Sequence, residues 1–526
     1  MKSMKKLTSI LLALVMAVAM AVPALAAEVD LADLEGPMTG GKITLTNATK
    51  DQTYDLYQIL YLESYEILTP ATGAGNYAYK ATQQWKPFFN TAEAKEFITI
   101  DSTGYATWVD GDSPSRVQKF AKAALKYAKE NGIKPVATKN GDATGSLVFD
   151  NLNLGYYLAD STVGTLCTLN TTNKEFTAED KNKTPTNTKY AEENGDFRQE
   201  NDVSVGTEFR FKSTVVAQEG ALNYVFHDKM QADVMEYTRI DKIVYKVSNN
   251  PEVTLAAYNP ETPDAEWDYK TVLPEEDAAA FHDCGCTFHV VFNQTFLDKM
   301  QAGINIDIYY YAKLTQAAVV AGAGNTNTSW LTYGENGALS TAVSETVTKT
   351  WNFDIFKFVS DANAADGKKP LDGATFKLVA AKNGLEDPGA EAAPLTFSAV
   401  AGQENTYKYD PTGTVTSFTS PADGRIHIQG LDAATYYLYE TAAPSGYNLM
   451  GSSVKVVIEQ GTGKVFKNLT ATTDKTIDIE NRTGNLLPST GGIGTTIFYV
   501  VGGILLVVAG VLLVVRKRMS SSKEAR

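Results

Sequence analysis

The sequence predicts an all-β chain of tandem β-sandwich domains, with a signal peptide at the N-terminus and a transmembrane helix at the C-terminus. At 526 residues the chain is too long for one ordinary core, which indicates several domains. A hydrophobic fraction of 44% with 21% charged residues is typical of packed globular domains. The 27 tyrosines and 22 phenylalanines, many in Thr- and Val-rich runs, favour β-strands.

The N-terminal segment has the pattern of a secretory signal. Lys2, Lys5 and Lys6 precede an uncharged apolar run over residues 7–20, and Ala24-Leu25-Ala26 supplies small residues for cleavage. We therefore expect residues 1–26 to be a signal peptide.

The C-terminal segment has the pattern of a membrane anchor. Residues 493–515 are uncharged and mostly apolar, which at about 1.5 Å per helical residue is long enough to cross a bilayer core. Arg516, Lys517 and Arg518 follow at once. The positive-inside rule keeps the tail 516–526 in the cytoplasm and leaves the preceding chain outside.

A pentapeptide stands directly before this span, namely Leu487, Pro488, Ser489, Thr490 and Gly491. With the apolar span and the basic tail it resembles a sortase sorting signal. The resemblance implies that sortase, the first expected partner, cleaves between Thr490 and Gly491 and passes the Thr490 carbonyl to an amine. The expected location is the cell surface, with covalent attachment to peptidoglycan or a fimbrium after a transient membrane-anchored stage.

Charge and motif content argue against several function classes, although glycosidase-like carboxylate pairs stay open. The formal charge is −14, and loss of the basic signal and tail makes the ectodomain more acidic still, which disfavours nucleic acid as a partner. No GxSxG, HExxH or Gly-rich phosphate loop occurs. We expect neither enzymatic activity nor a cofactor.

The three cysteines do not indicate a disulfide scaffold. Cys284 and Cys286 are separated by one residue, so a mutual disulfide is awkward, and Cys167 is far away in the sequence. Together with His282 and His289 the close pair matches no linear zinc spacing, so the sequence predicts no metal. The role of the cysteines stays open.

An internal repeat suggests the domain organisation. GSLVFDNLNLGYYLAD, residues 145–160, aligns with GRIHIQGLDAATYYLYE, residues 424–440, and each reads as a strand, a turn and a tyrosine-bearing strand. We expect related sandwiches at 27–185 and 348–486, flanking a different middle domain at 186–347.

The later copy resembles a collagen-adhesin B-type (CnaB) domain. The matching pieces are FDIFKF, LDGATFKL, YLYETAAPSGY and TIDIEN. The resemblance implies a spontaneous isopeptide bond between Lys357 and Asn481, assisted by Glu440. Burial favours the neutral forms of lysine and of carboxylic acids, so the amine can attack while the acid polarises the amide.

The earlier copy lacks the residues for such a bond. Asp160 takes the place of Glu440, and the opening strand ITLTN, residues 43–47, contains no lysine. We expect a CnaB-like sandwich without an internal bond. Val117, Phe120, Ala121, Ala124 and Leu125 mark one face of a helix inserted within residues 113–131.

The middle region resembles the central, CnaA-like isopeptide-forming domain of backbone pilins, through TPTNTKY, NYVFHDKM and GNTNTSWLTY. The resemblance implies that Lys189 is the nucleophile, Asp228 the assisting acid and Asn327 the acceptor. Asn325, two residues away, is a competing acceptor. Expected strands include EFRFKSTV, KIVYKV, FHVVF and INIDIYYYAKL.

Taken together, the chain resembles a major pilin of sortase-assembled fimbriae. The resemblance implies that a lysine near the end of the first domain, in FTAEDKNKTPT, accepts the Thr490 acyl group of another copy. Lys181 is favoured, and Lys183, Lys174 and Lys189 are alternatives. Further copies of the chain, minor pilins and host surface ligands are the implied partners. The alternative function is a monomeric wall-anchored adhesin, which needs no acceptor lysine.

Overall fold

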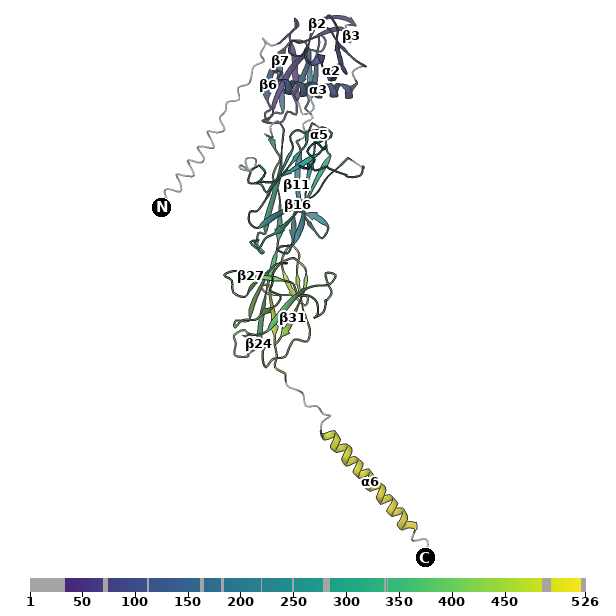
Figure 1. Cartoon of the computed structure of the whole chain (residues 1–526), viewed down its shortest axis with the longest axis vertical. Coiled ribbons are helices and arrows are strands. Elements are labelled where there is room, and N and C mark those ends of the chain that lie inside the picture. The colour runs from purple at the N-terminus through teal and green to yellow at the C-terminus, as the bar shows by residue number, and fades with distance from the viewer. Residues whose placement is uncertain are drawn as a thin grey trace, which may run out of the picture. The chain divides into compact units, whose positions relative to one another are not determined.

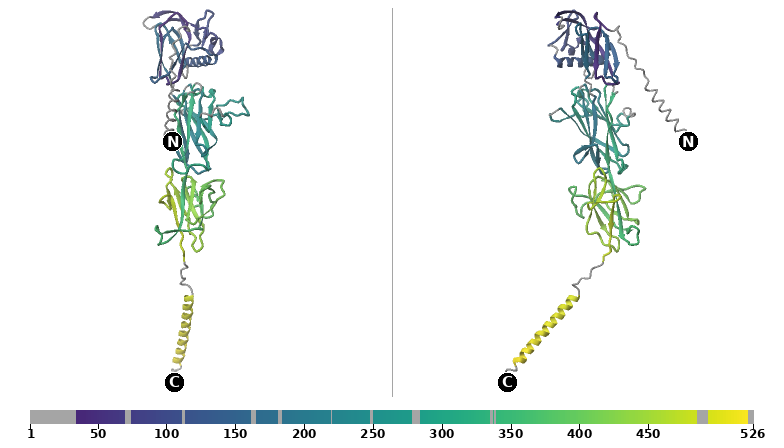
Figure 2. Two further views of the ribbon diagram at one scale, coloured as in Figure 1. Left: turned by 90° about the vertical axis from the view of Figure 1, so that its left-hand side faces the viewer. Right: turned by 180° about the vertical axis from the view of Figure 1, so that it is seen from behind.

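The computed structural model describes residues 34–69, 74–110, 113–160, 165–180, 184–218, 220–247, 250–277, 284–334, 337, 339–484 and 493–521. Strands dominate the chain, and in each sandwich they form two layers (Figure 1, Figure 2). The predicted all-β sandwich class is confirmed. The expected signal peptide and the LPSTG pentapeptide lie outside the described residues.

The first sandwich contains the earlier repeat copy. One sheet has the order β10-β1-β7, with β10 at Glu175–Glu179, β1 at Gly41–Thr46 and β7 at Ser146–Leu152. The other has the order β3-β2-β8-β9, with β6 beside β2; its strands are β2 (Thr53–Thr69), β3 (Ala74–Ala81), β6 (Ala137–Asn140), β8 (Gly155–Ala159) and β9 (Thr165–Leu169). Ile43 and Phe149 of the first sheet and Leu56 and Tyr157 of the second share one core.

A partly helical insertion joins β3 to β6. It comprises η2 (Phe88–Asn90), α2 (Ala92–Lys95), β4 (Ile98–Ile100), β5 (Ala106–Trp108) and α3 (Pro114–Asn131). Phe120, Ala121 and Ala124 of α3 are buried in one cluster with Trp85 and Phe88, so the helix and its apolar face are confirmed. The helix ends at Gly132, whose φ of 61° suits a left-handed cap.

The middle sandwich has two large sheets. The first has the order β12-β11-β14-β20-β16-β17, with β11 (Thr186–Glu193), β12 (Asp196–Arg198), β14 (Glu208–Val216), β16 (Met235–Lys246), β17 (Val253–Thr254) and β20 (Asn305–Leu314). The second has the order β13-β23-β21-β15-β19-β18, with β22 beside β21; its strands are β13 (Glu200–Asp202), β15 (Val225–Met230), β18 (Tyr269–Val272), β19 (Phe288–Phe292), β21 (Asn325–Tyr333), β22 (Leu339–Ser340) and β23 (Ser344–Lys349). A short helix, α5 (Gln294–Leu297), follows β19. All four strands expected here are present.

Strict alternation decides which side chains enter the middle core. Every second residue of β14 and β20 is buried, as expected for strands with one face on a core. Phe211 and Tyr310 of the first sheet meet Phe226 and Phe288 of the second in one apolar cluster. The two sheets therefore enclose a shared interior.

The third sandwich contains the later repeat copy. One sheet has the order β25-β24-β30-β28-β27, with β35 beside β24; its strands are β24 (Trp351–Ser360), β25 (Lys368–Pro370), β27 (Phe397–Ala399), β28 (Thr406–Tyr409), β30 (Arg425–Leu431) and β35 (Thr476–Glu480). The other has the order β29-β26-β31-β32-β33-β34, with β26 (Thr375–Ala380), β29 (Phe418–Thr419), β31 (Thr435–Ala442), β32 (Val454–Ile458), β33 (Val465–Lys467) and β34 (Thr470–Ala471). In both repeat copies the chain passes from one sheet to the other, from β7 to β8 and from β30 to β31.

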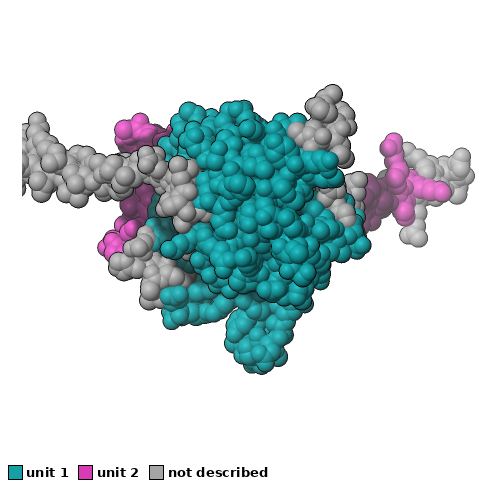
Figure 3. Space-filling model, turned by 90° about the horizontal axis from the view of Figure 1, so that it is seen from above, with its two compact units in different colours: residues 1–351, 430–432 teal, residues 352–429, 433–526 magenta. Residues whose placement is uncertain are grey.

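The chain divides into two compact units, which Figure 3 colours separately. One contains residues 1–351 and 430–432, the other residues 352–429 and 433–526. The expected domain limits at 185/186 and 347/348 stay predictions. In the second unit, α6 (Ile493–Ser521) contains a stretch, Ile497–Lys517, that is long and apolar enough to cross a membrane.

Candidate functional site

The third sandwich places the three residues expected from the CnaB resemblance together. Lys357 lies on β24 with a fully buried side chain, between Phe356 and Phe358. Strand β35 runs parallel to β24 with Ile479 opposite Lys357, which brings Asn481 to the lysine at the end of the strand. Glu440 reaches the same point from β31 of the facing sheet, also with a fully buried side chain.

The contacts among these three side chains are direct. The Lys357 ammonium lies against Asn481 Oδ1 and 3.0 Å from Glu440 Oε1. Asn481 Nδ2 donates to Glu440 Oε1 at 3.0 Å, and the backbone N–H of Met450 donates to Glu440 Oε2 at 2.8 Å. The Asn481 amide therefore lies between the lysine and the acid.

Burial also adjusts the protonation of the lysine. Loss of hydration lowers the pKa of Lys357, although Glu440 acts in the opposite direction. A lowered pKa increases the fraction of neutral amine, which is the nucleophilic form.

The middle sandwich places a second set together, but across its two sheets. Lys189 of β11 and Asp228 of β15 are both fully buried, with 2.5 Å between Lys189 Nζ and Asp228 Oδ2. Asn327 of β21, also fully buried, is connected through a tyrosine that the sequence analysis did not single out. The Tyr310 hydroxyl of β20 contacts both Lys189 Nζ and Asp228 Oδ2, and it accepts from Asn327 Nδ2 at 3.4 Å.

The buried environment shifts both ionisable partners toward neutrality. Desolvation lowers the pKa of Lys189 and raises the pKa of Asp228, each opposed by the attraction between them. Desolvation likewise raises the pKa of Tyr310, so its hydroxyl keeps its proton. An uncharged amine beside a protonated acid is the arrangement suited to amide attack.

The two candidate acceptors of the middle sandwich differ in their surroundings. The Asn325 side chain is engaged by backbone groups: its Oδ1 accepts from the Val319 N–H at 2.8 Å, and its Nδ2 donates to the carbonyls of Val319 and Thr348, each at 3.1 Å. Asn327 Oδ1 is buried with no hydrogen-bond partner among the described residues. The geometry therefore favours Asn327 over Asn325.

The first sandwich has no comparable set among its described residues. Strands β1 and β10 run parallel, like β24 and β35, with Leu45 opposite Ala178 at the position that corresponds to Lys357. Asp180 follows β10 where Asn481 follows β35, and it accepts from the Tyr54 hydroxyl at 2.5 Å. Asp160 forms an ion pair with Lys129 of α3 at 3.2 Å.

The lysines considered as polymerisation acceptors differ in their accessibility. Lys181 and Lys183 lie outside the described residues, and Lys174 is exposed in the connection between β9 and β10. Lys189 is fully buried in the middle core, which removes it from the set of accessible amines.

Two parts of the chain match protein-family models. Residues 361–473 match the SpaA model, described as a prealbumin-like fold domain, and residues 480–521 match the LPXTG cell wall anchor motif. No curated protein sequence matches the chain.

Several solved structures are similar at low identity. The T6 backbone pilin of Streptococcus pyogenes is 15% identical with a TM-score of 0.45, over 81% of this chain and 81% of that one. The major pilin SpaD of Corynebacterium diphtheriae is 14% identical with a TM-score of 0.41, over 85% and 98%. The major pilin BcpA of Bacillus cereus is 14% identical with a TM-score of 0.38, over 85% and 100%.

The anchor motif indicates where on the cell the protein is found. It overlaps the end of the third sandwich and continues into α6, which is the order required for export followed by attachment. The chain is a cell-wall-anchored surface protein that carries a prealbumin-like domain.

Proposed function

We propose that this wall-anchored chain is the backbone subunit of a covalently polymerised pilus. The observation that carries the proposal is the pair of buried Lys–acid–Asn sets in a chain that ends in an LPXTG anchor. A chain anchored at one end and loaded at the other benefits from covalent bonds inside its sandwiches, whereas a catalyst has no need of them.

Each buried set forms one isopeptide bond. The neutral amine of Lys357 attacks Cγ of Asn481, and that of Lys189 attacks Cγ of Asn327. A new Nζ–Cγ bond forms, the Cγ–Nδ2 bond breaks, and Nδ2 leaves as ammonia after proton transfer through Glu440 or Asp228. No cofactor is required, and the protein is its own single-turnover substrate rather than an enzyme.

The bonds stabilise a sandwich against unfolding. By analogy with disulfides, closing a loop of more than a hundred residues contributes about 4–5 kcal/mol. Lys357 and Asn481 are 124 residues apart, which places their bond in this range. Tension applied to β24 and β35 then passes through a covalent link and not through the hydrogen bonds of the sheet alone.

Sortase joins the subunits in this proposal. It cleaves between Thr490 and Gly491 and transfers the Thr490 acyl group to a lysine of the next copy, for which Lys181 is favoured. The same chemistry attaches minor pilins and, at the base, peptidoglycan. Host surface ligands are further proposed partners.

An immunoblot of cell-wall extracts boiled in denaturant tests the proposal. The native strain is compared with Lys181→Ala, Lys183→Ala and Lys174→Ala strains, and exposed Lys126→Ala, which lies outside the candidate set, is the matched control. We expect a ladder of high-mass products in the native and control strains and its loss in the Lys181→Ala strain. A ladder that disappears only with Lys183→Ala or Lys174→Ala moves the acceptor to that residue.

A single wall-linked band in every strain would contradict the polymer and favour the monomeric adhesin.

The internal bonds are tested separately by the intact mass of the processed chain. We expect a deficit of two ammonia molecules, one for each Lys–Asn pair.

A further inference from the structure

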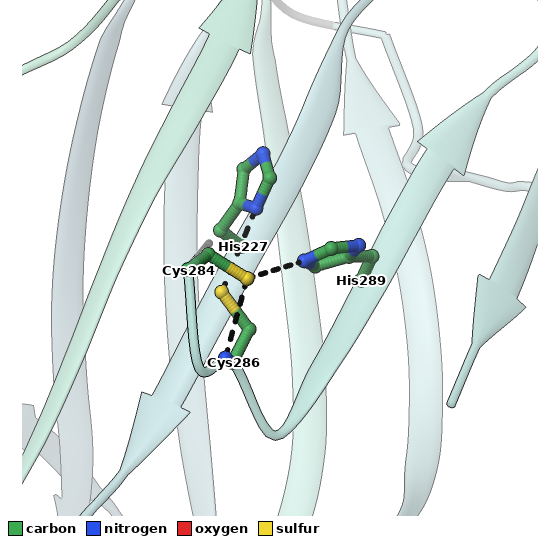
Figure 4. Close-up of side chains that lie close together, drawn as sticks. All are labelled: His227, Cys284, Cys286 and His289. Carbon is green, nitrogen blue, oxygen red and sulfur yellow. Dashed lines mark hydrogen bonds between the residues drawn. The ribbon is translucent and has the colours of Figure 1, made fainter. Parts of the chain in front are cut away.

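Two histidines and two cysteines converge on one face of the middle sandwich. His227, Cys284, Cys286 and His289 each offer a ligand atom, and these atoms all lie within 4.8 Å of one another (Figure 4). Cys286 and His289 are buried, while His227 and Cys284 are partly exposed. His282, which the sequence analysis paired with the cysteines, lies outside the described residues; the second histidine in this cluster is His227.

Strand register explains the convergence. His227 of β15 and His289 of β19 are directly opposite in an antiparallel pair, and their ring centroids are 4.3 Å apart. Asp228 is the next residue on β15 and points into the core beside Lys189, so His227 lies on the opposite face of the sheet. The two faces of one strand thus carry two separate clusters.

The segment between the cysteines turns both thiols toward the histidines. Gly285 has a φ of 58°, a left-handed conformation that glycine adopts without strain. The chain reverses there, as Figure 4 shows, and the N–H of Cys286 donates to Cys284 Sγ at 3.2 Å. A non-glycine residue at this position would also bring its Cβ within 3.3 Å of Lys229 Nζ.

Two sulfur–nitrogen separations match an edge of a zinc tetrahedron. Bond lengths of about 2.3 Å to sulfur and about 2.0–2.1 Å to nitrogen imply sulfur–nitrogen edges of roughly 3.6 Å. Cys284 Sγ lies 3.3 Å from His289 Nε2, and Cys286 Sγ lies 3.7 Å from His227 Nδ1. Two sulfur–nitrogen pairs are therefore spaced as in a tetrahedral zinc site, and all four ligand atoms lie within 4.8 Å of one another.

The surroundings of His227 hold its ring in place. Its Nε2 lies 3.0 Å from Thr332 Oγ1, which leaves Nδ1 directed at the cysteines. The ring stacks on Trp330 with an interplanar angle of 2°. A hydrogen bond to the second nitrogen of a metal-binding histidine is the usual way to orient that ligand.

We propose that His227, Cys284, Cys286 and His289 form a tetrahedral site for Zn²⁺. Two sulfur and two imidazole ligands suit this borderline-soft ion. On binding, the two thiol S–H bonds break, their protons go to solvent, and two Zn–S bonds form. The spacing of the cysteines and histidines along the sequence predicted no metal, so this site differs from that expectation. It does not rest on the pilus function.

The ion ties the turn at Gly285 to strands β15 and β19. Asp228 lies one residue from His227, so the metal also restrains the strand that carries the acid of the middle isopeptide set. In an exported chain, coordination protects the paired thiols from oxidation.

Metal titration of the full-length chain tests the site. The chain is purified in detergent under reducing conditions, stripped with a chelator and titrated with Zn²⁺ against a chromogenic competitor. We expect one equivalent to bind. Co²⁺ in place of Zn²⁺ should give the intense visible bands of tetrahedral coordination and a thiolate charge-transfer band, which tests the unsubstituted protein directly.

Substitutions assign the ligands. Cys284→Ser, Cys286→Ser and His227→Gln should each weaken zinc binding by at least about 100-fold, whereas Thr332→Val, which removes an outer contact, should weaken it by about 10-fold. His427→Gln is the matched control, because His427 pairs with Asp354 at a separate place. Three results would overturn the proposal: no stoichiometric zinc with both thiols reduced, unchanged binding in the double cysteine variant, or a Cys284–Cys286 disulfide in chain released from the wall.

Discussion

The two lysine sets use the same chemical groups but connect different parts of a sandwich. In the third sandwich, Lys357 lies on β24, Asn481 directly follows the neighbouring parallel strand β35 of the same sheet, and Glu440 comes from the facing sheet. In the middle sandwich, Lys189 and Tyr310 come from one sheet, while Asp228 and Asn327 come from the other. The bond in the third sandwich would link two neighbouring strands of one sheet, and the bond in the middle sandwich would link its two sheets.

This difference shows which features the proposed chemistry needs. The two sets do not share the position of the acceptor asparagine relative to the lysine strand. They also differ in the acid, which is glutamate in one set and aspartate in the other. Both sets share a fully buried lysine whose pKa is lowered by desolvation, an acid within hydrogen-bond distance and an asparagine amide. The first sandwich keeps the parallel pairing of β1 and β10 but has Leu45 at the lysine position, so the fold alone does not create the site.

The largest effect should follow removal of the middle acid. Asp228→Ala leaves Lys189 in the core without its carboxylate and stops bond formation. The missing cross-link removes a contribution of about 4–5 kcal/mol, and the unreacted Lys189 amine stays in the core without its partner. Thermal unfolding together with intact mass would show a strongly destabilised middle sandwich and a deficit of one ammonia instead of two.

Glu440→Ala provides the matched comparison in the third sandwich. It should abolish the other bond and leave the middle one intact. A full deficit of two ammonia molecules in either variant would show that the acid is dispensable, and the shared mechanism would then be wrong.

The acceptor of the middle bond can be assigned by two neighbouring substitutions. Asn327→Ala should eliminate one ammonia loss, whereas Asn325→Ala should retain both. Asn325→Ala still removes hydrogen bonds to Val319 and Thr348, which costs about 1–3 kcal/mol where buried groups are left unpaired. Peptide mapping of the cross-linked fragment identifies the joined residue, and a Lys189–Asn325 linkage would contradict the assignment.

The sequence predicted more of the third site than of the middle one. Lys357, Glu440 and Asn481 each fall in a distinctive motif, and strand pairing then places them within contact. Tyr310 was missed because INIDIYYYAKL contains three successive tyrosines, and only the register of β20 decides which one points into the core. His227 was missed as a neighbour of the cysteines because it lies 59 residues from Cys286, and only the pairing of β15 with β19 joins them.

A smaller effect should distinguish the rates at which the two isopeptide bonds form. Tyr310→Phe removes the hydroxyl that contacts Lys189, Asp228 and Asn327, while the described contacts of the third set are direct. Loss of a buried hydrogen bond of about 1–3 kcal/mol should slow middle-bond formation by roughly 5- to 150-fold. Peptide mapping of samples taken over time after synthesis follows each cross-linked fragment separately, because intact mass gives only the total ammonia loss, and the third-sandwich bond is then the internal control. A middle-bond rate unchanged from that of the native chain would remove Tyr310 from the mechanism.

The smallest effect is expected in the first sandwich, where the acid of the repeat has a structural role. Asp160 pairs with Lys129 of α3 at a partly exposed position, and such pairs contribute about 0–1 kcal/mol. Lys129→Gln should therefore lower the unfolding free energy by about 1 kcal/mol or less and leave the ammonia deficit at two. Lys126→Gln, an exposed lysine of the same helix with no ion pair within the described part of the chain, is the control. A change in the mass deficit on Lys129→Gln would mean that Asp160 assists a bond in this sandwich. The contrast between Leu45 and Lys357 would then no longer explain why the set is found, among the described residues, in the middle and third sandwiches and not in the first.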